Sequence, residues 1–173
     1  LFYDILIRSY FLEEFYELQR KPDTQFPDQT LQLLSMYHPD QFAYAPMHWH
    51  SEFEINFVRT GSAEFTCGEQ KFRSADGDII VIPPNVMHSV YPCPEMHQIY
   101  DTLVFSPELF GSSESDRCIQ ECVKPLTTGS MQIQMHITPK HHYYTVMESI
   151  VETVFACAKG DTPQLDMLLR GEL

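Results

Sequence analysis

Three histidines and one glutamate stand at spacings that suit a metal site or a polar binding pocket. His48, His50 and Glu54 follow the pattern HxHx3E, and His88 closes a second cluster that begins at Gly77. Neutral imidazole favours zinc, copper, iron and nickel, and a carboxylate adds a negatively charged oxygen. These residue types predict either a divalent transition-metal centre, with Zn, Ni, Fe or Mn as candidate ions, or a polar binding pocket without an ion.

The segments around these residues are predicted to be strands that must converge on one cavity. His48 and His50 are two positions apart, so on a strand their side chains point to the same face. Asn56 lies two positions beyond Glu54 and shares its face, which makes it a further candidate for the pocket. His88 has to come from a different strand, and a closed β-barrel is a geometry that can bring the two strands together.

Short apolar or alternating segments separated by Gly and Pro indicate a barrel or sandwich of many strands. The predicted strands cover residues 31–37, 54–59, 64–67, 71–73, 79–82, 88–91, 99–105 and 131–137. Pro83 and Pro84 should end one of them, because proline cannot donate a hydrogen bond to a ladder. The last segment alternates strictly between apolar and polar residues, which predicts a strand with one wet face.

The two clusters resemble the two sequence motifs of the cupin superfamily, whose members are small double-sheet barrels of the jelly-roll type. The first cluster, including Gly61, matches the family pattern at each ligand position. The second has Asn85 where the family usually has Gly, and Asn tolerates a left-handed turn well. The resemblance implies a mainly β cupin double-stranded β-helix barrel, here followed by C-terminal helices.

Within the cupins, residues 30–158 are most similar to the N-terminal effector-binding and dimerisation domain of AraC-type bacterial transcription regulators. The matching segments are His48-Trp49-His50, Glu54-Ile55-Asn56-Phe57, Gly77-Asp78-Ile79-Ile80-Val81-Ile82-Pro83-Pro84, His88, Leu103-Val104-Phe105-Ser106-Pro107 and Lys124-Pro125-Leu126. The resemblance implies a homodimer that senses a small molecule, a sugar in the best-known relatives. DNA would be bound only through a helix-turn-helix module that is absent from this chain and that we expect to follow it in the full-length protein.

The chain divides into an N-terminal helix or arm (1–29), a cupin barrel (30–138) and C-terminal dimerisation helices (139–173). Helical periodicity predicts a helix over residues 4–20, and prolines mark a linker after it. In some relatives such an arm closes over the effector. A capping-box pattern at Ser113 to Asp116 predicts a short helix that Pro125 ends.

Thr138-Pro139 reads as an N-cap followed by proline at the first helical position, so a helix is predicted from residue 139, with Gly160 as its C-cap. Another helix is predicted from Pro163 with Leu165, Leu168 and Leu169. The apolar stripe of the first helix consists of Tyr143, Met147, Ile150, Val151, Val154 and Phe155. It is wider than one packed face needs, so we expect it both to pack on the barrel and to form a dimer surface.

Charge and cysteine content narrow the class of protein. The net charge of −13, from 24 acidic and 11 basic residues, argues against nucleic-acid binding by this chain, because phosphate-binding surfaces need clustered Lys and Arg. An odd number of cysteines, five, without a CxxC motif fits a reducing, cytoplasmic compartment, with Cys118 and Cys122 expected to be buried. No apolar segment approaches the length of a membrane helix.

An enzyme interpretation rests solely on the four ligand candidates, because no nucleophile elbow or phosphate-binding glycine loop is visible. The alternative to a non-enzymatic sensor is a stand-alone metallo-cupin enzyme, such as a dioxygenase or isomerase. The helical tail after residue 139 favours the regulator. The other histidines are predicted to be structural (His38, His97, His136) or solvated (His141, His142).

Overall fold

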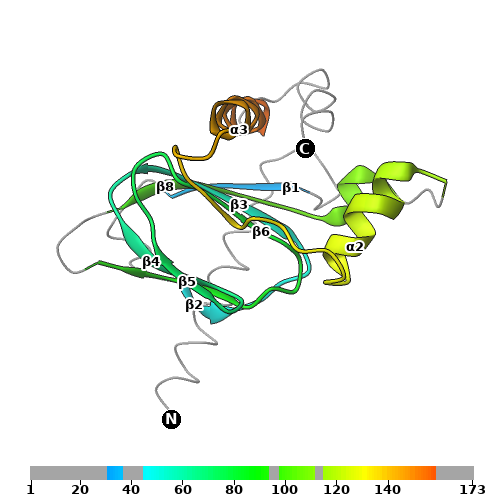
Figure 1. The fold of residues 1–173 in the computed structure, drawn as a ribbon, viewed down its shortest axis with the longest axis horizontal. Helices are drawn as coiled ribbons and strands as arrows, with labels where there is room; N and C mark the ends of the chain where they lie inside the picture. Colours follow the sequence, from blue (N-terminus) through cyan, green and yellow to red (C-terminus); the bar gives the residue numbers. More distant parts are fainter. Residues whose placement is uncertain (1–30, 37–44, 94–97, 112–114, 159–173) are drawn as a thin grey trace, which may run out of the picture.

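A computed structural model describes residues 31–36, 45–93, 98–111 and 115–158, in which strands predominate and a long helix comes last (Figure 1). The strands are β1 (Leu31–Met36), β2 (Ala45–His48), β3 (Phe53–Thr60), β4 (Ala63–Cys67), β5 (Gln70–Arg73), β6 (Ile79–Ile82), β7 (His88–Pro92), β8 (Ile99–Phe105) and β9 (His136–Ile137). The helical segments are η1 (Pro107–Phe110), η2 (Ile119–Val123), α2 (Lys124–Thr127) and α3 (Tyr144–Ala158). The predicted N-terminal helix and linker, His38, His97, Ser113, Gly160 and the last predicted helix lie outside the described residues.

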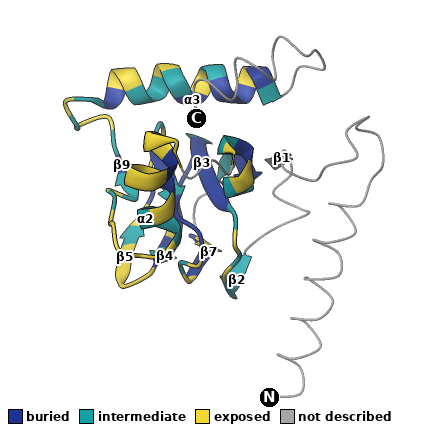
Figure 2. Ribbon diagram, turned by 90° about the vertical axis from the view of Figure 1, so that its right-hand side faces the viewer, coloured by how far each residue is buried: buried dark blue, intermediate teal, exposed yellow. Residues whose placement is uncertain are grey.

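The strands form two antiparallel sheets that face each other. One sheet has the order β1-β8-β3-β6-β9 and the other has the order β2-β7-β4-β5. Figures 1 and 2 show α3 lying across the outer face of the five-stranded sheet. This arrangement confirms the predicted mainly β, jelly-roll type of barrel with a helix after it.

Strand β3 separates two cores because its side chains alternate between the two faces of the sheet. Phe53, Ile55 and Phe57 point outward and pack with the residues of α3. Val58, on the other face, packs between the sheets with residues of β4, β6 and β7. Glu54 and Asn56 share this inner face, so the strand places two buried polar groups inside the barrel.

Helix α3 is held on the barrel by its apolar stripe. Val151, Val154 and Phe155 are buried in the outer core, and the other three stripe residues (Tyr143, Met147 and Ile150) are partly buried against it. Packing on the barrel thus accounts for all six residues. A dimer surface on α3 remains a prediction, and it would have to use the opposite face, where Val146 is 63% exposed.

A charged clamp also ties α3 to the five-stranded sheet. The Arg59 guanidinium donates to Asp101 Oδ2, with Nε at 2.8 Å and Nη2 at 2.7 Å. It also donates to both carboxylate oxygens of Glu152 on the helix. The Arg59 guanidinium lies over the Phe57 ring, 4.2 Å from its centroid, so the clamp is anchored in the outer core.

The predicted start of this helix at residue 139 is wrong, because α3 begins at Tyr144. Thr138 instead closes a turn: its carbonyl accepts from the His141 amide at 3.0 Å, and its hydroxyl accepts from the Lys140 amide at 3.4 Å. The side chain of His141, predicted to be solvated, accepts from the Thr138 amide at 3.0 Å. A Thr-Pro pair suits a single turn as well as a helix, and here the local hydrogen bonds select the turn.

The short helix does not end at Pro125 as predicted. The Asp116 carboxylate caps it by accepting from the amides of Cys118 and Ile119 at 2.8 and 3.3 Å. The chain then passes through the π-helical turn η2, in which the Lys124 amide bonds to the Ile119 carbonyl, and continues into α2. The altered bonding of a π turn accommodates a proline that lacks an amide proton.

Two further expectations are corrected in this part of the chain. Cys118 and Cys122 are exposed, whereas burial was expected. The predicted strand over residues 131–137 is reduced to β9, although the Val81 amide still donates to the Met135 carbonyl at 2.8 Å. Its neighbour β6 is followed directly by Pro83 and Pro84, which cannot donate, so the ladder stops there.

Candidate metal centre

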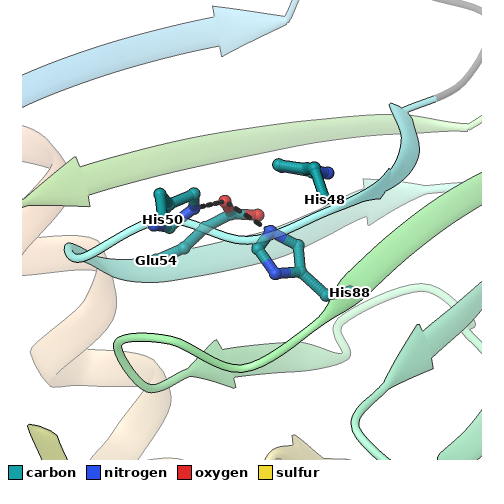
Figure 3. A group of neighbouring side chains, drawn as sticks. All are labelled: His48, His50, Glu54 and His88. Carbon is teal, nitrogen blue, oxygen red and sulfur yellow. Dashed lines mark hydrogen bonds and ion pairs between the residues drawn. The ribbon is translucent and has the colours of Figure 1, made fainter. Parts of the chain in front are cut away.

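The four predicted ligand residues come together between the two sheets (Figure 3). His48 ends β2 and His88 begins β7, and the two are direct partners in the four-stranded sheet. Glu54 comes from β3 in the opposite sheet. His50 lies in the loop after β2, not on a strand as predicted. One candidate ligand atom from each residue lies within 4.8 Å of all the others, so the four converge on one point.

A backbone contact holds the His50 loop in place. The Asn85 amide, in the turn after β6, donates to the His50 carbonyl at 2.7 Å. Asn85 has a φ of 65°, the left-handed conformation predicted for this departure from the family's glycine. The turn that precedes His88 therefore also fixes the position of His50.

The three imidazoles are oriented alike. Each Nδ1 lies close to a backbone carbonyl oxygen: His48 to Pro46 at 2.7 Å, His50 to Glu52 at 3.1 Å and His88 to Val86 at 2.8 Å. A carbonyl oxygen can only accept, so each Nδ1 carries a proton. The neutral form of each ring then presents the Nε2 lone pair, which is the form that binds a metal.

The Nε2 atoms gather around the Glu54 carboxylate. Its Oε2 lies 3.0 Å from His50 Nε2 and 3.4 Å from His88 Nε2. The His88 Nε2 atom is buried, and apart from this 3.4 Å ion-pair contact it has no hydrogen-bond partner within the described part of the chain. A buried polar atom without a partner is costly, and a cation bound at this point would satisfy it together with the neighbouring ligand atoms.

Two further polar residues hold the Glu54 carboxylate from behind. Asn56 Nδ2 donates to Glu54 Oε1 at 2.7 Å, and the Thr102 hydroxyl donates to Asn56 Oδ1 at 2.6 Å. These bonds leave Oε2 directed at the imidazoles. Asn56 was predicted for the pocket, whereas Thr102 was missed. Its position in the period-two pattern of residues 99–105 could have indicated it only if the pairing with β3 were known.

The pKa values reflect this crowding. Burial opposes ionisation of Glu54, but the neighbouring imidazoles of His50 and His88 hold its pKa well below the usual range. Burial and the charge of His88 lower the pKa of His48. Burial also acts to lower the pKa of His88, but the Glu54 carboxylate outweighs it and raises that pKa. The cluster thus keeps an ionised carboxylate among imidazoles that differ in their affinity for protons.

A cavity inside the barrel borders the cluster. About 40 Å³ of it is open to the centre of a water-sized sphere. The lining residues are Ala45, His48, Glu54, Asn56, Phe65, His88, Ser89, Val90, Tyr100 and Thr102. Sequence reasoning identified the polar end of this cavity but not its other walls, which come from β2, β4, β7 and β8.

The residues present fit a divalent transition metal. Three imidazoles and one carboxylate are a ligand set that zinc, nickel, iron and manganese accept, and the protonated Nδ1 atoms supply the outer contacts that usually orient such ligands. His48, His50, Glu54 and His88 would hold the ion. When bound, it would act as a Lewis acid toward an anionic or carbonyl group in the adjacent cavity.

The other described histidines do not join the cluster. His136, predicted to be structural, stacks on Phe72 at a centroid distance of 4.0 Å, and its Nε2 lies 2.7 Å from Asp78 Oδ2. His142 is exposed. Within the described ranges, no helix has the length and apolar character needed to cross a lipid bilayer.

Comparisons with known proteins agree with the motifs. The family model described as AraC-like ligand binding domain matches residues 32–125, more than half of the chain. No curated protein sequence matches the chain.

Several solved structures are similar over part of the barrel. One is a conserved protein of unknown function from Streptococcus pyogenes, with 25% identity over 47% of this chain and 68% of that chain (TM-score 0.37). Another is oxalate decarboxylase from Bacillus subtilis, described with Mn(II) centres, with 28% identity over 36% of this chain and 18% of that chain (TM-score 0.31). A cupin 2 conserved barrel domain protein from Rhodopseudomonas palustris matches with 19% identity over 44% of this chain and 59% of that chain (TM-score 0.34).

Proposed function

This chain belongs to the family of AraC-like ligand binding domains, and on that premise we propose that it is the small-molecule sensing and dimerisation domain of a cytoplasmic bacterial transcription regulator. The observation that carries the proposal is the cavity between the two sheets, with His48, Glu54 and His88 at one end of it. In this account the barrel itself catalyses no reaction. The regulator would bind DNA through a separate helix-turn-helix domain.

Signal transmission is proposed to run through β8. Thr102 on its inner face bonds to Asn56 beside the cavity, and the adjacent Asp101 on its outer face bonds to Arg59. Arg59 in turn binds Glu152 on α3. An effector can switch such a protein only if it binds one arrangement of barrel and helix better than another. Thr102 and Asp101 are neighbours on β8 and point to opposite faces of the sheet. A movement of β8 caused by an effector in the cavity would therefore also move the contacts that hold α3.

The test measures effector binding and its consequence together. Purified protein is titrated with candidate effectors by calorimetry, and its sedimentation is followed with and without the effector that binds. We expect binding without chemical change of the effector, a dimer in solution, and a change in DNA affinity once the following domain is included. A monomer with and without effector would contradict the dimerisation part of the proposal.

The second candidate is a metal-dependent enzyme, a dioxygenase or isomerase. The observation that favours it is the cluster of four residues that could hold a metal ion, three of which line the cavity. Product analysis separates the two candidates. Sustained turnover of a cavity-bound molecule by the metal-loaded wild type, lost in His88→Ala, would favour the enzyme, whereas recovery of the bound molecule unchanged would favour the sensor.

A further inference from the structure

We propose that the barrel cavity binds a short-chain carboxylic acid whose far end carries a hydrogen-bonding group, and not a sugar. The acid group would bind at the His/Glu cluster, and the far end would bond to the Tyr100 hydroxyl. This inference rests on the proposed function, because it names the chemical class of the molecule sensed at the same site.

The size of the cavity limits what can enter. About 40 Å³ is open to the centre of a water-sized sphere. This small space favours a ligand of few heavy atoms over a bulky one.

The walls offer few partners to a polyhydroxylated ligand. Ala45, Phe65 and Val90 present apolar surface. The side chains of Asn56 and Thr102 already bond to each other, and Asn56 also donates to Glu54. The Ser89 hydroxyl also lines the cavity and is buried without a hydrogen-bond partner in the described part of the chain. It can serve one hydroxyl of a buried sugar, whereas the others would lack partners, and each such group costs about 1–3 kcal/mol. An aliphatic chain loses nothing by contact with these walls and gains from leaving water.

Tyr100 supplies a second polar point away from the cluster. Along β3, Glu54 is followed on the inner face by Asn56, which pairs with Thr102, and then by Val58, which pairs with Tyr100. The Tyr100 ring packs edge-on against Phe65 of the facing sheet, with centroids 6.4 Å apart. Tyr100 is partly buried and lines the cavity. Its hydroxyl can donate a hydrogen bond to a ligand group and accept one from it.

The charge of the cavity lining indicates which kind of ligand group would bind at the His/Glu cluster. Among the described residues that line the cavity there is no lysine or arginine, and Glu54 is the only carboxylate. A cation held by the three imidazoles and Glu54 would balance the charge of an anionic ligand. A carboxylate provides that charge and coordinates hard and borderline divalent metals through oxygen.

The test compares ligands that differ by a single hydroxyl. The cobalt(II)-loaded protein is titrated with butyrate, with γ-hydroxybutyrate, and with a panel of aldopentoses and aldohexoses. Binding is read from the visible absorption of cobalt and from the fluorescence of Trp49. This residue is the only tryptophan and lies between His48 and His50. We expect both acids to bind, γ-hydroxybutyrate about 3- to 10-fold more tightly, as one added hydrogen bond predicts.

The variant Tyr100→Phe removes the hydroxyl and keeps the ring on Phe65. It should eliminate the difference between the two acids while leaving butyrate affinity unchanged. Tyr91→Phe, at a tyrosine that is 46% exposed and does not line the cavity, is the matched control and should preserve the difference. Thermal unfolding of each variant shows whether the fold is intact.

The outcomes separate this inference from the proposed function. Sugar binding in the cavity without acid binding would overturn the inference and leave the sensing function standing. Acid binding followed by turnover would support the ligand class and contradict the sensor. Binding of no ligand, or an equal preference for γ-hydroxybutyrate in Tyr100→Phe, would overturn the inference.

Discussion

Thr102 and Asn56 face each other across strands β8 and β3, and the Thr102 hydroxyl donates a 2.6 Å hydrogen bond to Asn56 Oδ1. This bond determines which way the Asn56 amide points, so that its nitrogen donates to Glu54 Oε1. The orientation of Glu54 toward the imidazoles therefore depends on Thr102, whose hydroxyl bonds to Asn56 and not to the histidines of the cluster. Outer contacts of this kind tune how well a site holds its metal.

We expect Thr102→Val to weaken metal binding at the cluster by about 10- to 100-fold, the usual effect of losing an outer contact. The variant leaves Asn56 Oδ1 buried without its donor, which should also cost about 1–3 kcal/mol of folding stability. Competition with a chelator measures the first effect, and thermal unfolding measures the second. Thr66→Val, on the outer face of β4, is the control. Unchanged metal affinity in Thr102→Val would show that Glu54 is oriented by other means.

Metal binding should weaken as the pH falls, because protons compete for the Nε2 lone pairs. The raised pKa of His88 means that this competition begins above the ordinary histidine value of 6.5. The pKa of Glu54 is lowered, so its carboxylate stays ionised throughout this window. One displaced proton should raise the apparent Kd about tenfold per pH unit below the pKa of His88. A constant Kd between about pH 8 and about pH 5.5 would contradict this prediction.

The two faces of α3 should respond differently to an added charge. Val154 is 1% exposed, so Val154→Glu buries a carboxylate against the barrel and should unfold the protein or cost several kcal/mol. Val146 is 63% exposed, so Val146→Glu should leave the fold and its thermal unfolding intact. If the outer face of α3 forms the dimer seam, sedimentation of Val146→Glu should show a monomer. A dimer that persists in this variant would place the seam elsewhere.

The chain by itself should not bind duplex DNA. Its 24 acidic residues against 11 basic ones produce an unfavourable field toward a polyanion. A mobility-shift assay near physiological salt should detect no complex, although ordinary non-specific binders reach about 10⁻⁴ to 10⁻⁶ M under such conditions. A salt-sensitive complex formed by this chain alone would place a phosphate-binding surface on the sensing domain.

Local sequence pattern was sufficient for most of the strands and for the identity of the cluster. Strands β6 and β8 have the predicted bounds, and period-two spacing correctly placed Asn56 beside Glu54. The cupin-like motifs predicted that His88 would join His48, and the pairing of β2 with β7 brings the two residues together. These features depend on residues that are near in sequence or on a family pattern.

The parts that sequence could not predict depend on register or on competing local bonds. Thr102 reaches Asn56 through the pairing of β8 with β3, and nothing near Thr102 in the sequence indicates that contact. The Thr138 N-cap pattern fits a turn and a helix equally well, which is why the start of α3 was misplaced. Pro125 normally signals a helix end, but the preceding π turn allows the helix to continue.

Metal content is the measurement that tests the cluster most directly. The wild type, His48→Ala, His88→Ala and His142→Ala are purified without added metal and analysed by elemental mass spectrometry, then again after equilibration with zinc. Because His48 and His88 supply two of the four converging ligands and His142 is exposed, we expect bound metal in the wild type and in His142→Ala. We expect that metal to be lost in the other two variants. Full metal content in both His48→Ala and His88→Ala, or no metal in the wild type after equilibration, would show that these residues do not form a metal site.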